Sequence, residues 1–245
     1  MGLFSSLKNA AVSITKGVVK AVEVTCEICE EAFRWGKEKC YEIKGKIDRW
    51  QTEGGTPPVD PVPPEIKTSY GPKIKRTKDK IEEIFPAGIK EECTKLTPEE
   101  RKNKVLEMAE VTSQILEIEN PPEIVFEVPE NEEDVWRSYG SYNHNQNTLT
   151  LNLAMIVTEE PKLFQEQIST VFHEMVHARQ LRAIDALRQG VSCDNMGYTN
   201  DWIESLAINW INYISPNENY EAYTKQPIEA EAYWVEQQLG LTSLN

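Results

Sequence analysis

The stretch from Thr170 to Gln180 reads Thr-Val-Phe-His-Glu-Met-Val-His-Ala-Arg-Gln and contains the pattern His-Glu-x-x-His. Four residues advance an α-helix by about 400°, so His173 and His177 project from one face, one turn apart. Two imidazoles in that position can bind one metal ion. Glu174 lies about 100° round the helix from His173, which suits it to take a proton from a water on that ion rather than to bind the ion. The pattern therefore predicts two metal ligands and one general base.

Apolar residues flank the pattern at near-helical spacing, which predicts a long, mostly buried helix from Pro161 to about Gln189, ended by Gly190. These apolar residues are Leu163, Phe164, Ile168, Val171, Phe172, Met175, Val176, Leu181, Ile184 and Leu187. Two of the three histidines of the chain lie inside the pattern. The alternative interpretation is a pair of core histidines whose ring nitrogens are satisfied by hydrogen bonds. A third ligand further along the chain would favour the metal.

Such a ligand is available in a second predicted helix, which begins at Pro227 and ends at Leu239, before Gly240. Glu229 and Glu231 both lie near the start of this helix. They project about 200° apart round the helix axis, so they cannot both face the same ion. Either carboxylate would complete a His, His, Glu site with a fourth position open for water. The residues themselves leave the two glutamates as alternatives.

The chain resembles a known family at this point. His173-Glu174-x-x-His177-x-x-Gln180 is followed, some fifty residues later, by Tyr-x-x-x-Pro-x-Glu-x-Glu-Ala. This combination resembles the zincin metallopeptidases with a downstream glutamate ligand, gluzincin-like domains that recur among bacterial secreted effectors and toxins. The resemblance covers roughly residues 120 to 240. It implies a Zn²⁺ site made by the two histidines and Glu229, the first glutamate of Glu-x-Glu-Ala, with Glu231 either supporting the site or solvated.

The chain also departs from two zincin patterns. It has no Asn-Glu-x-x-x-Asp signature of the thermolysin type, and no third histidine follows the motif as it does in metzincins. A tetrahedral oxyanion would need a second electrophile besides the metal. Tyr223, six residues before Glu229, is the first candidate for that role. Tyr220, Tyr233 and Tyr142 are alternatives, and each of the four would otherwise be a packing aromatic.

The resemblance implies an α+β, zincin-like fold, mainly helical, with a small twisted β-sheet over the motif helix. Alternating patterns predict strands at Glu123–Val128, Trp136–Asn143 and Asn147–Leu153, with a turn at His144–Gln146. The edge strand of such a sheet can pair with an extended peptide. The resemblance therefore places residues Thr148–Leu153, or the adjacent strand, beside the cleft.

Two more helices are predicted from start and stop signals. Thr97-Pro98-Glu99-Glu100 combines a capping threonine, proline at the first helical position and glutamate at the third, and predicts a helix to about Ile118. A further helix is expected from Asn200 to Ile214. Its apolar side is predicted to carry Trp202, Leu206, Trp210 and Ile211.

The first part of the chain has a different character. Residues 1–50 predict an amphipathic helical segment whose only charges before Glu23 are Lys8, Lys16 and Lys20. Such a segment packs on the catalytic domain or contacts a membrane surface through residues 1–25. Residues 51–64 are rich in proline and glycine and predict a linker. The zincin-like domain then spans residues 65–245, with its core at about 120–240. The basic run between Lys67 and Lys80 is expected to be a solvated face.

Composition limits the choice of function. The net charge of −14 argues against nucleic acid as a partner, because phosphate binding uses clustered Lys and Arg. Five cysteines, an odd number, are expected to be thiols in a reducing compartment. No apolar run approaches the ~18 residues of a membrane span, and no signal peptide is evident. The expected location is the bacterial cytoplasm, or a host or rival cell into which the protein is delivered.

The sequence therefore favours a zinc-dependent peptidase that acts on a protein or peptide substrate. Two alternatives from other classes stay open. One is a binding or scaffold protein that keeps a zincin fold without catalysis. The other is a membrane-acting effector in which the N-terminal helix has the primary role.

Overall fold

The computed structural model describes residues 62–128 and 139–241. The chain divides into two compact units, Met1–Pro57 and Pro58–Asn245, and all the described residues belong to the second. The predicted N-terminal helix at residues 1–50 lies outside the described residues. The elements are α2 (Pro64–Ile84), α3 (Ile89–Cys93), α4 (Pro98–Ile115), β1 (Glu123–Glu127), β2 (Gly140–Asn143), β3 (Thr148–Asn152), α6 (Leu153–Val157), α7 (Pro161–Arg188), the 3₁₀ turn η1 (Asp194–Met196), α8 (Asn200–Ile211), α9 (Tyr220–Lys225) and α10 (Pro227–Leu239). The described part is mostly helical α+β, as predicted.

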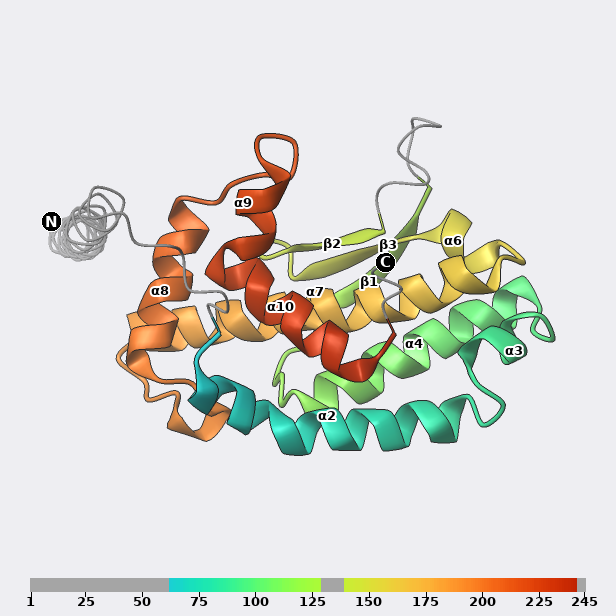
Figure 1. Cartoon of the computed structure of the whole chain (residues 1–245), viewed down its shortest axis with the longest axis horizontal. Helices are drawn as coiled ribbons and strands as arrows, with labels where there is room; N and C mark the ends of the chain where they lie inside the picture. The colour runs from blue at the N-terminus through green and yellow to red at the C-terminus, as the bar shows by residue number, and fades with distance from the viewer. Residues whose placement is uncertain (1–61, 129–138, 242–245) are drawn as a thin grey trace, which may run out of the picture. The chain divides into compact units, whose positions relative to one another are not determined.

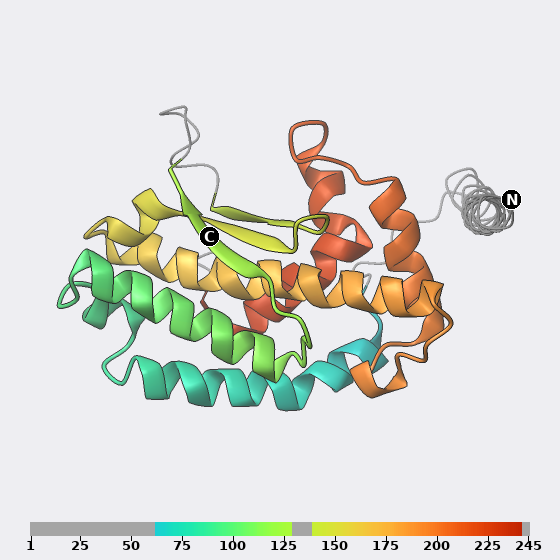
Figure 2. The same ribbon diagram turned by 180° about the vertical axis from the view of Figure 1, so that it is seen from behind.

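Helix α7 runs through the middle of this unit. The sheet lies on one side of α7, and α4 and α2 lie on the other side (Figures 1 and 2). Helix α10 packs along α7, and α8 contacts both of these helices. The prediction of a long, mostly buried motif helix is confirmed, because every residue from Gln167 to Leu181 is buried. Gly190 follows the helix with a φ of 71°, the left-handed conformation typical of a glycine at a helix end.

The sheet has three strands in the order β1-β3-β2, with β1 parallel and β2 antiparallel to β3. The three strands occur where alternating patterns predicted them, with shorter bounds. Residues 136–138 of the second predicted strand lie outside the described residues. Strand β3 is central, so β2 and β1 are the two edges of the sheet.

Strand β2 passes very close to α7 at Gly140. A Cβ at this position would lie 2.8 Å from the Thr150 carbonyl oxygen and 3.0 Å from Cγ2 of Thr170. These distances are shorter than carbon contacts in packed interiors, so only glycine allows the approach. Thr170 precedes His173 by one turn. The glycine therefore brings an edge strand directly beside the motif helix.

Local signals set several helix ends as predicted. Thr97 accepts a hydrogen bond from the Glu100 amide, and the Glu100 carboxylate accepts one from the Thr97 amide, which makes a complete capping box. Helix α10 has the predicted bounds, and Gly240 ends it with a φ of 70°. The predicted apolar side of α8 is partly wrong. Trp202 and Leu206 are buried, whereas Ile211 is 57% exposed.

Helix α2 was not predicted, although its basic residues were expected to be solvated. Ile66, Tyr70, Thr77 and Ile84 are buried on its inner side, at helical spacing. The expectation of a solvated basic face is partly correct, because Lys75, Arg76 and Lys78 are exposed, whereas Lys67, Lys73 and Lys80 are only partly exposed. The helix begins at Pro64, the last residue of the predicted linker, and contains Pro72. Within the described residues, no helix has the length and apolarity that a membrane crossing requires.

Candidate metal centre

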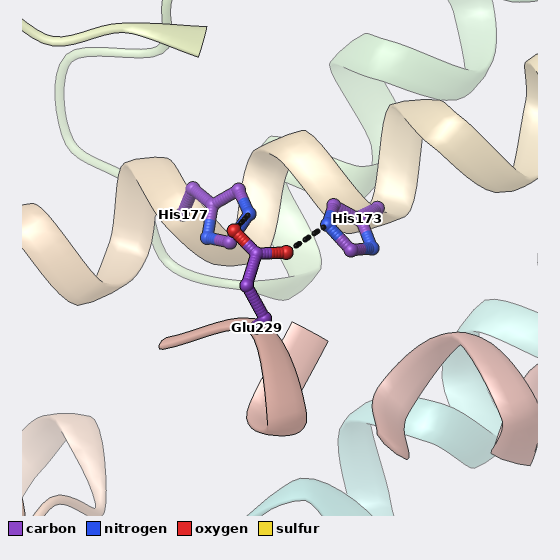
Figure 3. A group of neighbouring side chains, drawn as sticks. All are labelled: His173, His177 and Glu229. Atoms are coloured by element: carbon purple, nitrogen blue, oxygen red, sulfur yellow. Dashed lines mark hydrogen bonds and ion pairs between the residues drawn. The ribbon is translucent and has the colours of Figure 1, made fainter. Parts of the chain in front are cut away.

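Three of the predicted residues meet in one place. His173 and His177 project from α7, and the carboxylate of Glu229 reaches them from α10 (Figure 3). Nε2 of His173 lies 3.2 Å from Oε2 of Glu229, and Nε2 of His177 lies 3.5 Å from Oε1. All three residues are buried, and one ligand atom from each lies within 4.8 Å of the others.

The geometry and chemistry of this group fit a divalent metal ion. Nitrogen and oxygen ligands of a tetrahedral ion lie ~2.0–2.1 Å from it and therefore about 3.3 Å from one another. The distances from Glu229 to the two imidazoles are close to that value. Two imidazoles and a carboxylate suit Zn²⁺ and other first-row divalent ions. The sequence left Glu229 and Glu231 as alternatives. Glu229 faces the two histidines, so it is the glutamate that could bind the metal with them.

The short distances between these three side chains also shift their pKa values. Burial lowers the pKa of His173, but hydrogen bonds to Glu229 and Glu236 outweigh it and raise the pKa to about 10. Burial likewise lowers the pKa of His177, and the charge of Glu229 raises it overall. Burial raises the pKa of Glu229, but the two imidazoles hold it well below its usual range. The site therefore favours a carboxylate beside cationic groups, an arrangement in which a metal ion can replace the imidazole protons.

Each imidazole is also held on its far side. Nδ1 of His173 lies 3.3 Å from Oε2 of Glu236, and the other oxygen of Glu236 accepts a 2.6 Å hydrogen bond from Ser169. A carboxylate behind a metal-binding histidine fixes the tautomer and the ring orientation. Sequence reasoning missed Glu236. Its spacing was informative, because a residue seven positions after Glu229 lies on the same face of α10 two turns later.

The second histidine is held by Gln180, which follows it by three residues on α7. Nδ1 of His177 lies 2.9 Å from Oε1 of Gln180. The amide nitrogen of Gln180 donates a 3.0 Å hydrogen bond to the carbonyl of Ile228. Ile228 directly precedes Glu229, so this one side chain orients an imidazole on α7 and also attaches α10 beside it.

Glu231 points away from the metal group into a separate buried cluster. It accepts hydrogen bonds from Tyr70 at 2.7 Å, from Tyr198 at 2.6 Å and from the indole of Trp202 at 2.7 Å. The suggestion that Glu231 is a solvated helix residue is wrong, because it is 0% exposed. The guanidinium of Arg179 lies over the rings of Tyr70 and Tyr198, 4.7 and 4.6 Å from their centroids. Consequently α2, α7, α8 and α10 are held together behind the site.

Glu174 lies at an open cleft of about 470 Å³. His177 and Glu229 line the same cleft, together with β2 residues Gly140, Ser141 and Tyr142. The general-base candidate and two of the metal-ligand candidates thus face one solvent-connected space. Of the two strands that the resemblance left open, it is β2, the edge strand next to β3, that borders the cleft.

The tyrosine candidates separate into two groups. Tyr223 and Tyr142 line the cleft, whereas Tyr220 is 62% exposed and Tyr233 packs on the His173 ring at a centroid distance of 4.8 Å. Burial and the charge of Glu229 raise the pKa of Tyr223 far above its usual value. Tyr213, which sequence reasoning missed, lines the cleft and donates a 2.8 Å hydrogen bond to Oε1 of Glu229. No local pattern marks Tyr213, because it lies after α8 and reaches the site only through folding.

Comparisons of the chain with protein-family models, with curated proteins and with solved structures each returned no match. What the structure itself supports is a buried His, His, Glu group that could bind a metal ion, beside a glutamate and three tyrosines in an open cleft.

Proposed function

We propose that this protein is a zinc-dependent peptidase of the zincin type, with His173, His177 and Glu229 as the metal ligands. The main support is the convergence of these three side chains, from helices separated by about fifty residues, beside Glu174 at one cleft. A purely structural metal site needs closed coordination and no base. In this protein the group opens to a cleft that has a carboxylate at its edge.

Zn²⁺ at this site would supply Lewis acidity and would lower the pKa of a coordinated water from ~15.7 to ~7. In this proposal the carboxylate of Glu174 accepts a proton from the attacking water. It then delivers that proton to the nitrogen of the leaving amine. The carbonyl carbon gains a bond to the water oxygen and loses its bond to nitrogen, so that one carboxylate and one amine are released.

Tyr223 and Tyr213 are the candidates for stabilising the negative charge on the carbonyl oxygen. Burial, together with the nearby Glu229, raises the pKa of both hydroxyls. Both side chains therefore keep their O–H groups at neutral pH. The O–H of Tyr213 already donates to Oε1 of Glu229, which makes Tyr223 the first candidate for the oxyanion. A donor aimed at the developing oxyanion stabilises the transition state more than the substrate.

Strand β2 offers a means of aligning a peptide. The Asn152 amide donates to the carbonyl of Tyr139, which fixes the hydrogen-bonding pattern of the two antiparallel strands. In such a pair every second residue bonds to the neighbouring strand, so Gly140 and Tyr142 are the residues of β2 that do not bond to β3. Backbone groups of these two residues are directed away from β3, along the edge that borders the cleft. An extended peptide can add to such an edge as a further strand.

The proposal is tested by separating metal binding from hydrolysis. Glu174→Gln is expected to keep stoichiometric zinc and to lose hydrolysis of denatured protein substrates, because it keeps the shape of the base but cannot accept the proton. His177→Ala is expected to lose both. Glu107→Gln, an exposed carboxylate on α4, is the matched control and is expected to change neither. Metal content by elemental analysis and cleavage by gel and mass spectrometry provide the two measurements.

Full hydrolysis by Glu174→Gln would remove the mechanism. The scaffold alternative gives a different pattern, in which the wild-type protein carries zinc and cleaves no substrate. The membrane-effector alternative depends on residues 1–50, which lie outside the described residues, and liposome binding by a fragment of those residues would test it.

A further inference from the structure

The cleft has two unlike walls. One wall is the edge strand β2, and the floor is made by Glu174 and His177 from α7 with Ile228 and Glu229 from α10. A second part of the lining, called here the aromatic wall, is made by Trp210, the last-but-one residue of α8, by Tyr213 after it, and by Tyr223 of α9. These three aromatic side chains come from one segment, residues 210–223, which runs from the end of α8 into α9.

The aromatic wall is built as a connected group. The ring centroids of Trp210 and Tyr213 are 6.4 Å apart, and those of Tyr213 and Tyr223 are 6.1 Å apart. Trp210 also contacts the ring of His144 edge-on at 6.5 Å. Contacts of this kind hold aromatic rings in fixed orientations. Trp210 was expected to be a packing residue of its helix, but the structure shows that it also forms the cleft wall.

Apolar surface continues outside the cleft on the same segment. Of the seven large hydrophobic residues that are exposed in the described part of the chain, Ile211, Tyr213 and Tyr220 all belong to residues 211–220. Single exposed apolar residues are ordinary, but a group of them beside a pocket with aromatic rings in its lining marks a surface that contacts a ligand or partner.

Within the described part of the chain, the charged residues that line the cleft are those of the proposed site. Among the described residues that line it, only Glu174, His177 and Glu229 can carry a charge, and all three have roles in the proposed site. The aromatic wall contains no Lys or Arg to pair with an acidic substrate side chain and no free carboxylate to pair with a basic one. Burying an unpaired charge there would be unfavourable. The surplus of acidic residues in the whole chain therefore does not extend to the wall that would contact the substrate.

We infer that the cleft receives a large apolar side chain, aromatic or branched aliphatic, from the residue next to the bond that is cleaved. This inference rests on the proposed function, since it assigns a substrate class to the same site. Tyr142 and β2 hold the peptide backbone on one side, and the side chain packs against Trp210, Tyr213 and Tyr223 on the other. The volume of about 470 Å³ exceeds the needs of a methyl group and lies within the ~300–1,000 Å³ of ligand pockets.

Binding can be measured without hydrolysis in the zinc-loaded Glu174→Gln protein. Short alanine-based peptides that differ at one central residue (Phe, Leu, Ala, Lys or Asp) are titrated by isothermal calorimetry. Phe and Leu peptides are expected to bind at least about tenfold more tightly than the Ala peptide, since each buried methylene changes recognition by ~10-fold or more. Lys and Asp peptides are expected to bind no better than Ala. Wild-type protein is expected to cut the Phe and Leu peptides beside the central residue.

Trp210 is the residue to change, because it has no part in the metal site. Trp210→Ala is expected to reduce the preference for Phe over Ala by about tenfold, measured as the ratio of the two affinities. Trp210→Arg is expected to make the Asp peptide the better ligand, because it places a cation in the wall. Trp210→Phe keeps an aromatic surface and serves as the matched control. Zinc content and thermal unfolding of each variant identify any that do not fold.

The outcomes separate the two proposals. Selective binding of Phe and Leu peptides without cleavage by the wild-type protein would leave the apolar side-chain site standing and remove the peptidase, together with the assignment of that side chain to a cleaved bond. Cleavage or binding without any preference for apolar side chains would overturn the inference and leave the peptidase standing. Absence of binding by every peptide would also overturn the inference, as would unchanged selectivity in both folded Trp210→Ala and folded Trp210→Arg.

Discussion

Glu236 does not touch the metal position, yet it determines how one ligand is presented. Its carboxylate lies 3.3 Å from Nδ1 of His173, and a 2.6 Å hydrogen bond from Ser169 fixes the orientation of this carboxylate. An anion behind an imidazole makes the opposite nitrogen more basic and holds the ring in place. The pair thus gives His173 a fixed tautomer, with Nε2 directed at Glu229.

Removing this carboxylate is expected to weaken zinc binding. Glu236→Ala should lower the affinity by about 10–100-fold, as changes to such supporting groups do, and Glu236→Gln should have a smaller effect because it keeps an acceptor for the imidazole. Competition with a chelating indicator measures the affinity. Ser169→Ala, which removes only the donor behind Glu236, should lie between wild type and Glu236→Ala. Unchanged affinity in folded Glu236→Ala would contradict the role assigned to this residue.

Tyr213 and Tyr223 are expected to differ in what they support. Tyr213 donates to Glu229, so Tyr213→Phe should weaken metal binding. Tyr223→Phe should keep the metal and lower kcat by about 10²–10³, the effect of losing one oxyanion donor. Zinc affinity and steady-state kinetics separate the two effects. Tyr220→Phe, at an exposed position, is the control. If Tyr213→Phe loses kcat and Tyr223→Phe does not, the two assignments are reversed.

At the scale of elements, one buried arginine joins three parts of the fold. Arg101 of α4 is 2% exposed, and its guanidinium donates to the carbonyls of Cys93 and Leu96 and to those of Ile156 and Val157. The last two carbonyls are at the end of α6, which leads into α7. These bonds satisfy carbonyls at the ends of short helices, where the helix itself supplies no partner.

Arg101→Met is therefore expected to destabilise the fold. The methionine side chain fills similar space but leaves several buried carbonyls without donors, and each unpaired carbonyl costs ~1–3 kcal/mol before the structure relaxes. After relaxation we expect the free energy of unfolding to fall by about 3 kcal/mol. Arg101→Lys should lose less, because an ammonium replaces part of the fork. Urea denaturation of the zinc-loaded proteins measures both. A loss below about 1 kcal/mol for Arg101→Met would show that water satisfies these carbonyls.

The elements that the sequence predicted are those with strong local signals. Helix α4 has a capping box, α10 begins with a proline and ends with a glycine, and α7 has an unbroken apolar pattern. Helix α2 was missed because Gly71 and Pro72 interrupt it and its basic residues dominate its composition, although the inner positions keep helical spacing. Ile211 was placed on the wrong side, because nine residues after Trp202 correspond to about 900° and therefore to the opposite face of the helix, and Ile211 is indeed 57% exposed.

At the scale of the whole molecule, the site was predictable where it follows from helix geometry. His173, Glu174 and His177 were fixed by spacing on one helix. The preference for Glu229 came from resemblance, and the structure adds the physical reason. Hydrogen bonds from α2, from α8 and from the loop before α8 hold Glu231 in its own cluster, which turns Glu229 toward the histidines. Tyr213 and the aromatic wall could not be predicted, because they meet the site only through contacts between distant segments.

Because its ligands come from α7 and α10, the metal is expected to stabilise the whole folded unit. Binding to the native state alone adds RT ln(1 + [L]/Kd), about 2.7 kcal/mol when free zinc is 100 times Kd. For a unit of this size we expect Tm to rise by roughly 5–10 °C. Thermal unfolding with zinc, and again after a chelator, measures the shift.

Two variants show whether this stabilisation comes from the proposed ligands. His177→Ala should show almost no zinc-dependent shift, because a single imidazole and a carboxylate hold the ion weakly. Glu174→Gln should keep the full shift, because the base is not a ligand. A shift of equal size in wild type and in His177→Ala would mean that zinc binds elsewhere on the chain. The His, His, Glu group would then be a set of buried ion pairs that joins α7 to α10 without a metal.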